Sequence, residues 1–503
     1  MGHVSAVCED GRVNATRAGW QRMRLGGALL LLLLTSAYAH VGSPGIFVQG
    51  KAGPYPIYVT VQPPVVIPGQ AQVTVLCAQA CSTLGVERMD VAANVLAGDR
   101  TQMPEGVALV PGPVGSNQFT GTAWIMTQGS WQVKVHVEGT HGAGDLAVPL
   151  AAMPTRVLTM SRPFSLLLIV LGLLLVALLA KLAAAAVTQA GVETGGSPSV
   201  NARRRGRLAA VIAVSAVAIL LAGFAYLWRQ AVTRASATIY RPLGMSTSVA
   251  DGVLHLELTP PTALEQAMST RRLDDLALDH NHLMHLYVIS WPAMEHVFHL
   301  HPQQRAAGAF DLALPVLPAG RYRLFADVVH ADGFPETATA EVDLKQLAGR
   351  PLAGDDAAGE LPAAGGAGAD FTLKDGYRYR FGAATPAGEA LQAVPAREPV
   401  LLRFTLVDPA GHAPEDMTEY MGMPGHAAIL KRDGSVFAHV HPEGSAAMAA
   451  MMLANPGAMG QSGTAGNTVA FPFGFPSSGA YRVLIQMKHG DVVETGAVDL
   501  EVR

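Results

Sequence analysis

Two similar stretches of sequence decide how this chain folds. Residues 280–289 read HNHLMHLYVI and are followed by VFHLHP at 297–302, while residues 421–430 read MGMPGHAAIL and are followed by VFAHVHP at 436–442. Farther along, GRYRLFADVVH at 320–330 matches GAYRVLIQMKH at 479–489, so His330 and His489 occupy the same place in the two copies. Short apolar runs separated by turn residues indicate strands. The chain therefore contains an internal repeat, which predicts two similar β-sandwich domains.

The turn of the second copy predicts the register of its hairpin. Asp433-Gly434 between two apolar segments is typical of a two-residue type I′ turn. Pairing outward from that turn places His426 opposite His441. His439 lies two residues before His441 and therefore on the same face of the sheet. Because opposed residues have Cβ atoms about 5 Å apart, three imidazoles converge in this copy.

The first copy predicts the same arrangement. Its loop around Pro292 is one residue longer, but the extra residue fits in the turn, so His285 lies opposite His301 and His299 shares their face. Three imidazoles this close suit a transition metal. The alternative is a set of histidines that face solvent or hydrogen-bond to one another. The occurrence of the same trio twice favours a metal site.

The residues that flank the two trios differ. His280 and His282 align with Met421 and Met423. Thioethers select Cu(I), whereas imidazoles alone suit Cu(II), zinc or nickel. We therefore expect a His-rich copper site in the first copy and a Met/His copper site in the second, between which copper could be relayed. Zinc and nickel remain alternatives to copper.

The candidate metal ligands come from both copies and from the amino-terminal domain. They are His280, His282, His285, His299, His301 and His330 in the first copy, Met421, Met423, His426, His439, His441 and His489 in the second, and His40. Of these, His330 and His489 are outer candidates from a later strand. Three further methionines of the second copy, Met448, Met451 and Met452, have the spacing of a helix face, so core packing explains them as well as metal binding does.

The amino-terminal domain offers a third set of candidates. A free amine at His40 together with its imidazole would form a chelate, to which His136 or His141 could add a second ring. The side chain of His136 falls on the polar face of its strand, which equally fits simple exposure. Cys77 and Cys81 either pair as a disulfide, act as redox-active thiols or supply thiolates to a metal.

The amino terminus and two later apolar runs predict a membrane protein. Arginines precede the apolar run 25–36, and Ala37-Tyr38-Ala39 is typical of a signal-peptide cleavage site. Residues 164–187 and 208–228 are each long and apolar enough to cross a hydrocarbon core about 30 Å thick. The segment between them carries four arginines and one acid, which predicts a cytoplasmic loop. The alternative is that either run is a buried helix of a soluble domain.

We therefore expect a mainly β protein with three immunoglobulin-like or cupredoxin-like β-sandwich domains and two transmembrane helices. The expected order is a signal peptide (1–39), an extracytoplasmic β-sandwich (40–155), a transmembrane helix (164–187), a cytoplasmic loop (188–207), a second transmembrane helix (208–228), a β-sandwich with the first repeat (238–345), a flexible linker rich in Ala, Gly and Pro (346–370) and a β-sandwich with the second repeat (371–503). This order places the three domains on the periplasmic side of the inner (cytoplasmic) membrane.

Composition excludes several other classes of protein. Of the 503 residues, 15% are charged, and 35 basic against 39 acidic side chains leave a net charge of −4 and no basic field for nucleic acid. Three cysteines cannot build a disulfide framework. The expected partners are thus a metal ion, the lipid bilayer and a periplasmic protein, without nucleic acid.

Several motifs resemble known extracytoplasmic proteins. HVGSPG at 40–45, GPYP at 53–56 and GSWQVKV at 129–135, together with the two HxHP modules, resemble an uncharacterised group of bacterial membrane-anchored proteins with YtkA-like β-sandwich domains. A mature amino-terminal histidine followed by a β-sandwich also resembles the CopC-like periplasmic copper carriers. The first resemblance implies fold and anchoring without an established activity, and the second implies copper binding.

Two other functions fit parts of the sequence. His439-x-His441-x-Glu443 resembles the metal motif of cupin oxygenases, although the carboxylate comes early and the first repeat has Gln303 in its place. An iron or manganese oxygenase is therefore the enzyme alternative. The other alternative is a metal-free β-sandwich scaffold that binds a partner. The expected function is a membrane-anchored periplasmic copper-binding protein.

Overall fold

The computed structural model of this chain describes residues 45–97, 104–113, 117–158, 160–193, 195–237, 239–259, 272–345, 349–361, 370–457 and 466–503. The expected signal peptide and His40 lie outside these residues. Within them the protein is mainly β with two long apolar helices, as the sequence predicted.

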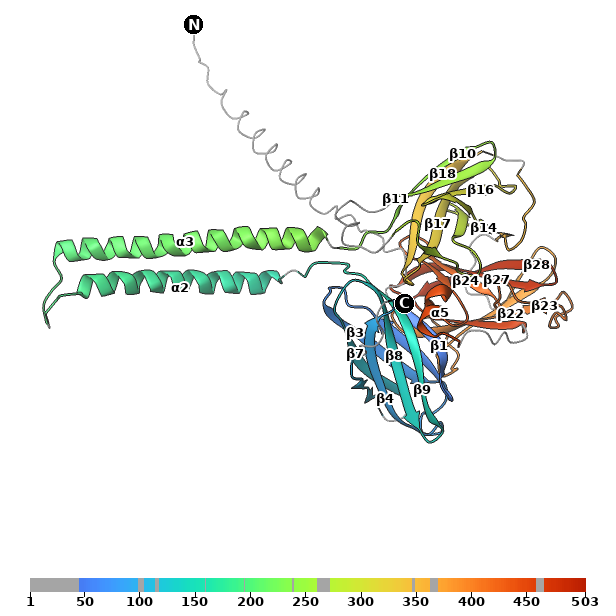
Figure 1. Ribbon diagram of the computed structural model, residues 1–503, viewed down its shortest axis with the longest axis horizontal. Coiled ribbons are helices and arrows are strands. Elements are labelled where there is room, and N and C mark those ends of the chain that lie inside the picture. Colours follow the sequence, from blue (N-terminus) through green and yellow to red (C-terminus); the bar gives the residue numbers. More distant parts are fainter. Residues whose placement is uncertain are drawn as a thin grey trace, which may run out of the picture. The chain divides into compact units, whose positions relative to one another are not determined.

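The first domain is a sandwich of two antiparallel sheets (Figure 1). Its strands are β1 (Ile46–Ala52), β2 (Tyr55–Gln62), β3 (Gly69–Cys77), β4 (Val86–Val95), β5 (Val107–Ala108), β6 (Val110–Pro111), β7 (Gln118–Ile125), β8 (Gly129–Gly139) and β9 (Gly142–Ala152). One sheet has the order β1-β2-β3-β7-β6 and the other β5-β4-β8-β9. Because side chains alternate along a strand, Ile57 and Val59 of β2 meet Val133 and Val135 of β8 in the core.

Two long helices follow the first domain. Helix α2 (Arg162–Gln189) starts with a proline in its first turn, where a missing N–H costs little, and α3 (Val200–Ala237) lies beside it (Figure 1). Both are long and apolar enough to cross a membrane, and no residue of their most apolar stretches is buried. Helix α3 begins at Val200, so residues 200–207 of the expected loop are helical.

The first repeat forms two layers that are joined along one edge. Its strands are β10 (Gly244–Ala250), β11 (Val253–Thr259), β12 (Leu276–Ala277), β13 (His285–Ser290), β14 (His296–Leu300), β15 (Gln303–Ala306), β16 (Ala309–Ala313), β17 (Gly320–His330), β18 (Pro335–Leu344) and β19 (Ala357–Glu360). The order is β15-β16-β11-β10-β18-β17-β13-β14-β19, with β12 on β17. A single parallel pair, Gly244↔Thr339, joins the layers, and Leu254 and Phe310 of one meet Val288 and Leu324 of the other.

The second repeat forms a sandwich of two separate sheets. Its strands are β20 (Asp370–Thr372), β21 (Arg378–Ala384), β22 (Pro399–Val407), β23 (Met417–Thr418), β24 (His426–Lys431), β25 (Phe437–Val440), β26 (Thr468–Gly474), β27 (Gly479–His489) and β28 (Val492–Val502), with the short helix α5 (Met448–Ala454). One sheet is β20-β21-β22-β26, and the other is β23-β27-β24-β25 with β28 on β27. Phe404 and Phe471 pack against Ile429 and Val483 between them.

The two repeats pack against each other through the outer faces of their hairpins. In β13, Leu286 and Val288 point into the core of their own domain, whereas Tyr287 belongs to a separate hydrophobic cluster that both repeats share. In that cluster the rings of Phe325 and Phe437 stack with centroids 4.4 Å apart. These strands are therefore buried on both faces, which is why their sequences read as continuous apolar runs.

The first domain also contacts the second repeat. Val48 of β1 pairs with Gly444, and the backbone N–H of Gln49 donates to the carbonyl oxygen of Glu443 at 2.7 Å. Met448 of α5 is buried in the hydrophobic core of the first domain. The chain directly after His441 is therefore held by an amino-terminal strand.

The structure corrects two expectations. The segment 346–370, expected to be a flexible linker, contains β19, whose Ala357 pairs with His299 of β14. The turn at Asp433-Gly434 is not type I′, because Gly434 takes a positive φ of 73° and Asp433 does not. The backbone N–H of Lys431 donates to the carbonyl oxygen of Val436 at 3.0 Å, so the four residues 432–435 form the loop. This loop closes the same strand pairing, and the predicted register survives.

Candidate metal centre

The first histidine trio assembles as predicted. His285 begins β13, His299 lies in β14, and His301 directly follows that strand. The pair Tyr287↔His299 confirms the predicted register. One ligand nitrogen of each ring lies within 4.8 Å of the other two, and Nδ1 of His285 is 3.1 Å from Nε2 of His299. The three buried rings therefore form a compact set of nitrogen donors.

The second trio gains a ring that the sequence analysis assigned to the first. Strand pairing confirms the predicted register, and the rings of His426 and His441 have centroids 5.2 Å apart. Yet the ligand nitrogens within 4.8 Å of one another are those of His426, His441 and His280. His280 belongs to the first repeat, and its Nδ1 donates to the carbonyl oxygen of Met421 at 2.8 Å.

The two trios lie next to each other in one continuous cluster of rings. The ring centroid of His439 lies 5.2 Å from that of His285 and 5.6 Å from that of His299. The expectation that each repeat supplies its own ligands fits the first group and fails for the second, which takes His280 from the first repeat. The histidine cluster, as named here, consists of His280, His282, His285, His299, His301, His426, His439 and His441.

Burial favours the neutral form of the buried rings in the histidine cluster. Removal from water disfavours the imidazolium form, and neighbouring imidazoles add to the effect. Together these causes lower the pKa of His439 to about 3. They also lower the pKa of His285, His299, His426 and His441 well below 6.5, and burial lowers the pKa of His280 and His301. Metals bind neutral imidazole, so these rings are in the ligand form at neutral pH.

Oxygen acceptors hold the outward nitrogens of the first trio. They are the carbonyl oxygen of Asp279 for Nε2 of His285, Oε1 of Gln486 for Nδ1 of His299 and Oδ1 of Asp356 for Nδ1 of His301, each at 3.0 Å. The outward nitrogen of a ring is the one that meets the oxygen acceptor, and the inward nitrogen is the other one. A proton on the outward nitrogen leaves a lone pair on the inward nitrogen. Metal-bound histidines are oriented in this way.

In the second trio only His280 and His441 follow the same pattern. Besides the bond from His280 to Met421, Nδ1 of His441 donates to the carbonyl oxygen of Ala446 at 3.4 Å. Nδ1 of His439 lies 3.6 Å from Oδ2 of Asp327. Among the described residues, seven buried nitrogens of the cluster have no hydrogen-bond partner. They are Nε2 of His280, His301 and His441 and both ring nitrogens of His426 and His439.

Carboxylates border the cluster. Oδ2 of Asp355 lies 3.1 Å from Nε2 of His282, and burial raises the pKa of Asp327 to about 6. Asp279 precedes His280, and its carboxylate accepts the backbone N–H of Ala449 in α5. Burial also raises the pKa of Asp279 to about 6. A bound cation would find both nitrogen donors and compensating negative charge, so the residues present fit a transition-metal ion.

His330 and His489 lie outside the cluster. Nδ1 of His330 is 2.9 Å from Asp275, and its Nε2 is 3.0 Å from Glu336. His489 repeats the arrangement with an aspartate and a glutamate, and its ligand nitrogen lies within 4.8 Å of Asp375 and Glu494 carboxylate oxygens. These two histidines form matching carboxylate networks at the end of β17 and β27. Neither of them joins the two groups of imidazoles described above.

The methionines take structural positions. Met421 contributes its carbonyl oxygen to the cluster, while Met423 is buried in the hydrophobic core of the first domain. Met448 and Met451 belong to the same core, and Met452 is 55% exposed. The packing alternative therefore holds for Met448 and Met451. The donor atoms that the structure brings together are imidazole nitrogens.

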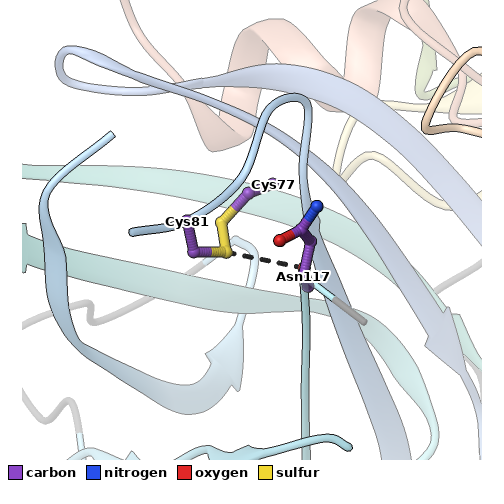
Figure 2. The surroundings of a disulfide bond; sticks show 3 residues. All are labelled: Cys77, Cys81 and Asn117. Carbon is purple, nitrogen blue, oxygen red and sulfur yellow. Dashed lines mark hydrogen bonds between the residues drawn. A yellow bond between two sulfur atoms is a disulfide. The ribbon is translucent and has the colours of Figure 1, made fainter. Parts of the chain in front are cut away.

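The candidates of the first domain lie apart from these contacts. His136 is exposed and bonds to Asp145 at 2.7 Å, as simple exposure would predict. His141 is also exposed. Cys77 and Cys81 form a disulfide, with the carbonyl oxygen of Asn117 beside Cys81 Sγ (Figure 2). The disulfide alternative is correct, and neither sulfur is a thiolate ligand in this state.

Sequence analysis missed the residues that orient the rings. Asp327 and Gln486 stand opposite each other in the alignment of 320–330 with 479–489, which was a usable signal. Asp355 and Asp356 lie in the segment expected to be a linker, where an acidic pair among small residues was the signal. Glu443 of the cupin-like motif does not join either ligand group of the cluster among the described residues.

Comparison with known proteins adds information on the repeats. Solved structures similar to this chain include a protein of Corynebacterium diphtheriae described as membrane anchored (10% identity, 91% of this chain and 94% of that chain, TM-score 0.15). Dimeric latent PorU of Porphyromonas gingivalis is another (7% identity, 87% of this chain and 32% of that chain, TM-score 0.14). At these TM-scores neither similarity carries an argument.

At the sequence level, no curated protein matches the chain. A family described as a domain of unknown function (DUF8832) matches residues 251–346 and 387–503. These ranges contain all eight members of the histidine cluster. The chain is therefore similar to this family over its two repeats.

Proposed function

We propose that this chain is a membrane-anchored copper-binding protein that handles copper on the periplasmic side of the cytoplasmic membrane. The observation that carries the proposal is the set of buried, neutral imidazoles whose inward nitrogens have no hydrogen-bond partner among the described residues. Each buried polar group left unpaired costs about 1–3 kcal/mol. Ligation of a metal would offset this cost for several rings at once.

Copper is the ion that this donor set favours. Imidazole sites bind divalent first-row metals in an order that peaks at Cu(II), ahead of zinc and nickel. The packing of Met423 in a hydrophobic core argues for Cu(II) rather than Cu(I) as the resting ion. The resemblance of the mature amino terminus to CopC-like copper carriers, and of the β-sandwiches to YtkA-like domains, supports the same choice.

Two features support the proposed location. The arginines at 203–207 lie at the start of α3, where a cytoplasmic end is favoured by the excess of positive charge. The disulfide between Cys77 and Cys81 belongs in an oxidising compartment, as expected for a domain outside the cytoplasm. No large apolar side chain of α2 or α3 is buried, so the apolar surface of both helices is free for lipid.

Metal titration of the full chain in detergent tests the proposal. The protein is freed of metal and titrated separately with Cu(II), Zn(II) and Ni(II) against a chromophoric chelator. We expect Cu(II) to bind most tightly. The double variant His299→Ala/His301→Ala should bind less copper than the wild-type chain while its far-UV circular dichroism is unchanged.

The matched control is His296→Ala. His296 lies in the same strand as His299 but on the opposite face, so its removal should leave copper affinity unchanged. Wild-type protein that holds no metal against a weak chelator would contradict the proposal and favour a scaffold that binds a protein partner. Tighter binding of zinc than of copper would contradict the choice of metal.

A further inference from the structure

We infer that the histidine cluster holds two metal ions at once and that each repeat completes the site of the other. The first site consists of His285, His299 and His301, and the second of His280, His426 and His441. This inference rests on the proposed function, because it concerns the same rings.

The number of donors exceeds what one ion can use. Zinc and copper sites in proteins take about four ligands, whereas the cluster supplies eight rings. The inward nitrogens also fall into two groups, each with its atoms within 4.8 Å. The ring of His439 lies between the groups, 5.2 Å from His285 and 4.6 Å from His441. Two ions therefore match the geometry, with His439 between them.

Carboxylates lie beside both groups of rings. Four aspartates border the cluster, and they are Asp279 beside His280, Asp327 beside His439, Asp355 beside His282 and Asp356 beside His301. Each group of rings therefore has a carboxylate beside it.

Both sites need the two repeats to be docked. The second site takes a ligand from the first repeat, because His280 reaches His426 with ring centroids 4.9 Å apart. The first site takes an orienting group from the second repeat, because Oε1 of Gln486 accepts from Nδ1 of His299. An ion that binds in either site therefore stabilises the contact that shapes the other. This coupling predicts that the two ions bind with positive cooperativity.

The test measures stoichiometry and magnetic coupling in the full chain in detergent. Cu(II) is added to metal-free protein, bound copper is counted by mass spectrometry, and electron paramagnetic resonance is recorded at each addition. We expect two copper ions per chain and a spectrum broadened by dipolar coupling between neighbouring ions. His299→Ala/His301→Ala and His426→Ala/His441→Ala should each retain one ion and show the spectrum of an isolated Cu(II).

Each outcome has a distinct meaning. Wild-type protein with a single copper ion that both double variants abolish would overturn the two-ion inference and leave the proposed function standing. Wild-type protein without copper would contradict both. If a double variant fails to fold, as judged by circular dichroism, the single variant His299→Gln or His441→Gln takes its place. His296→Ala serves as the control and should keep two coupled ions.

Discussion

Acidification should destabilise the metal-free protein steeply, because five rings of the histidine cluster are buried in their neutral form. Burial lowers the pKa of these rings in the folded state, whereas in the unfolded chain they titrate near 6.5. Below that pH the unfolded state binds more protons than the folded state. The stability contributed by neutral burial is therefore present above pH 6.5 and is lost as the pH falls.

The magnitude follows from the number of rings. Each histidine that stays neutral in the folded state lowers the free energy of unfolding of the protein by about 1.4 kcal/mol when the pH falls from about 7.5 to about 5.5. Five rings have a pKa that is about 3 or well below 6.5, and they are His285, His299, His426, His439 and His441. Together they reach about 7 kcal/mol, which is comparable with the whole stability of a typical domain.

Urea unfolding of the full chain in detergent, followed by far-UV circular dichroism at a series of pH values, measures this loss. His426→Leu/His441→Leu should reduce the loss by about 2.8 kcal/mol, because two protonation events disappear. His296→Ala should leave it unchanged. Equal stability at both ends of the pH range, or an unreduced loss in the double variant, would refute the account of neutral burial. Added copper should raise the stability at each pH and leave the pH dependence in place, because these rings of the folded state are already neutral without the metal.

Three further predictions concern the support of the site, the contact between repeats and the membrane topology. Gln486→Leu removes the acceptor of His299 and should weaken copper binding about 10–100-fold in a chelator titration, while Gln486→Glu should restore it. Phe437→Ala should lower the free energy of unfolding in urea by about 3–5 kcal/mol and lower copper affinity, because this fully buried ring stacks on Phe325 between the repeats. Val492→Ala, the control at an exposed position, should change the free energy of unfolding by less than about 0.5 kcal/mol. A cysteine introduced by Ser197→Cys, between α2 and α3, should react with a membrane-impermeant maleimide only after the membrane is permeabilised. A cysteine introduced by Asp491→Cys, in the second repeat, should react without permeabilisation. Labelling of both cysteines from the same side of the membrane would contradict the topology.

Much of the local structure could be predicted from the sequence. The pairs Tyr287↔His299 and Ala428↔His439 follow from period-two patterning and from counting outward from the turns. The prediction survived an incorrect turn type at Asp433-Gly434, because the four-residue loop closes on the same pairing. The two apolar helices were evident from length and hydrophobicity alone.

The orienting groups were harder to predict. Gln486 and Asp356 are distant in sequence from the rings that they hold, at 187 and 55 residues. Their contacts arise from packing between elements, which strand periodicity does not report. Asp356 was also hidden by the Ala, Gly and Pro composition of its surroundings, although strand β19 begins at the next residue.

By itself, the sequence determined that two hairpins each carry a histidine trio on one face, because alternation along a strand and the length of a turn are local properties. The sequence did not determine which other surface of the protein packs against the histidine face of each hairpin. Three features became evident only from the folded chain: the two faces meet each other, His280 crosses to the other repeat, and Met423 packs in a hydrophobic core. The physical reason is that the hairpin strands are apolar on both faces, and a two-sided apolar strand can pack against several different partners.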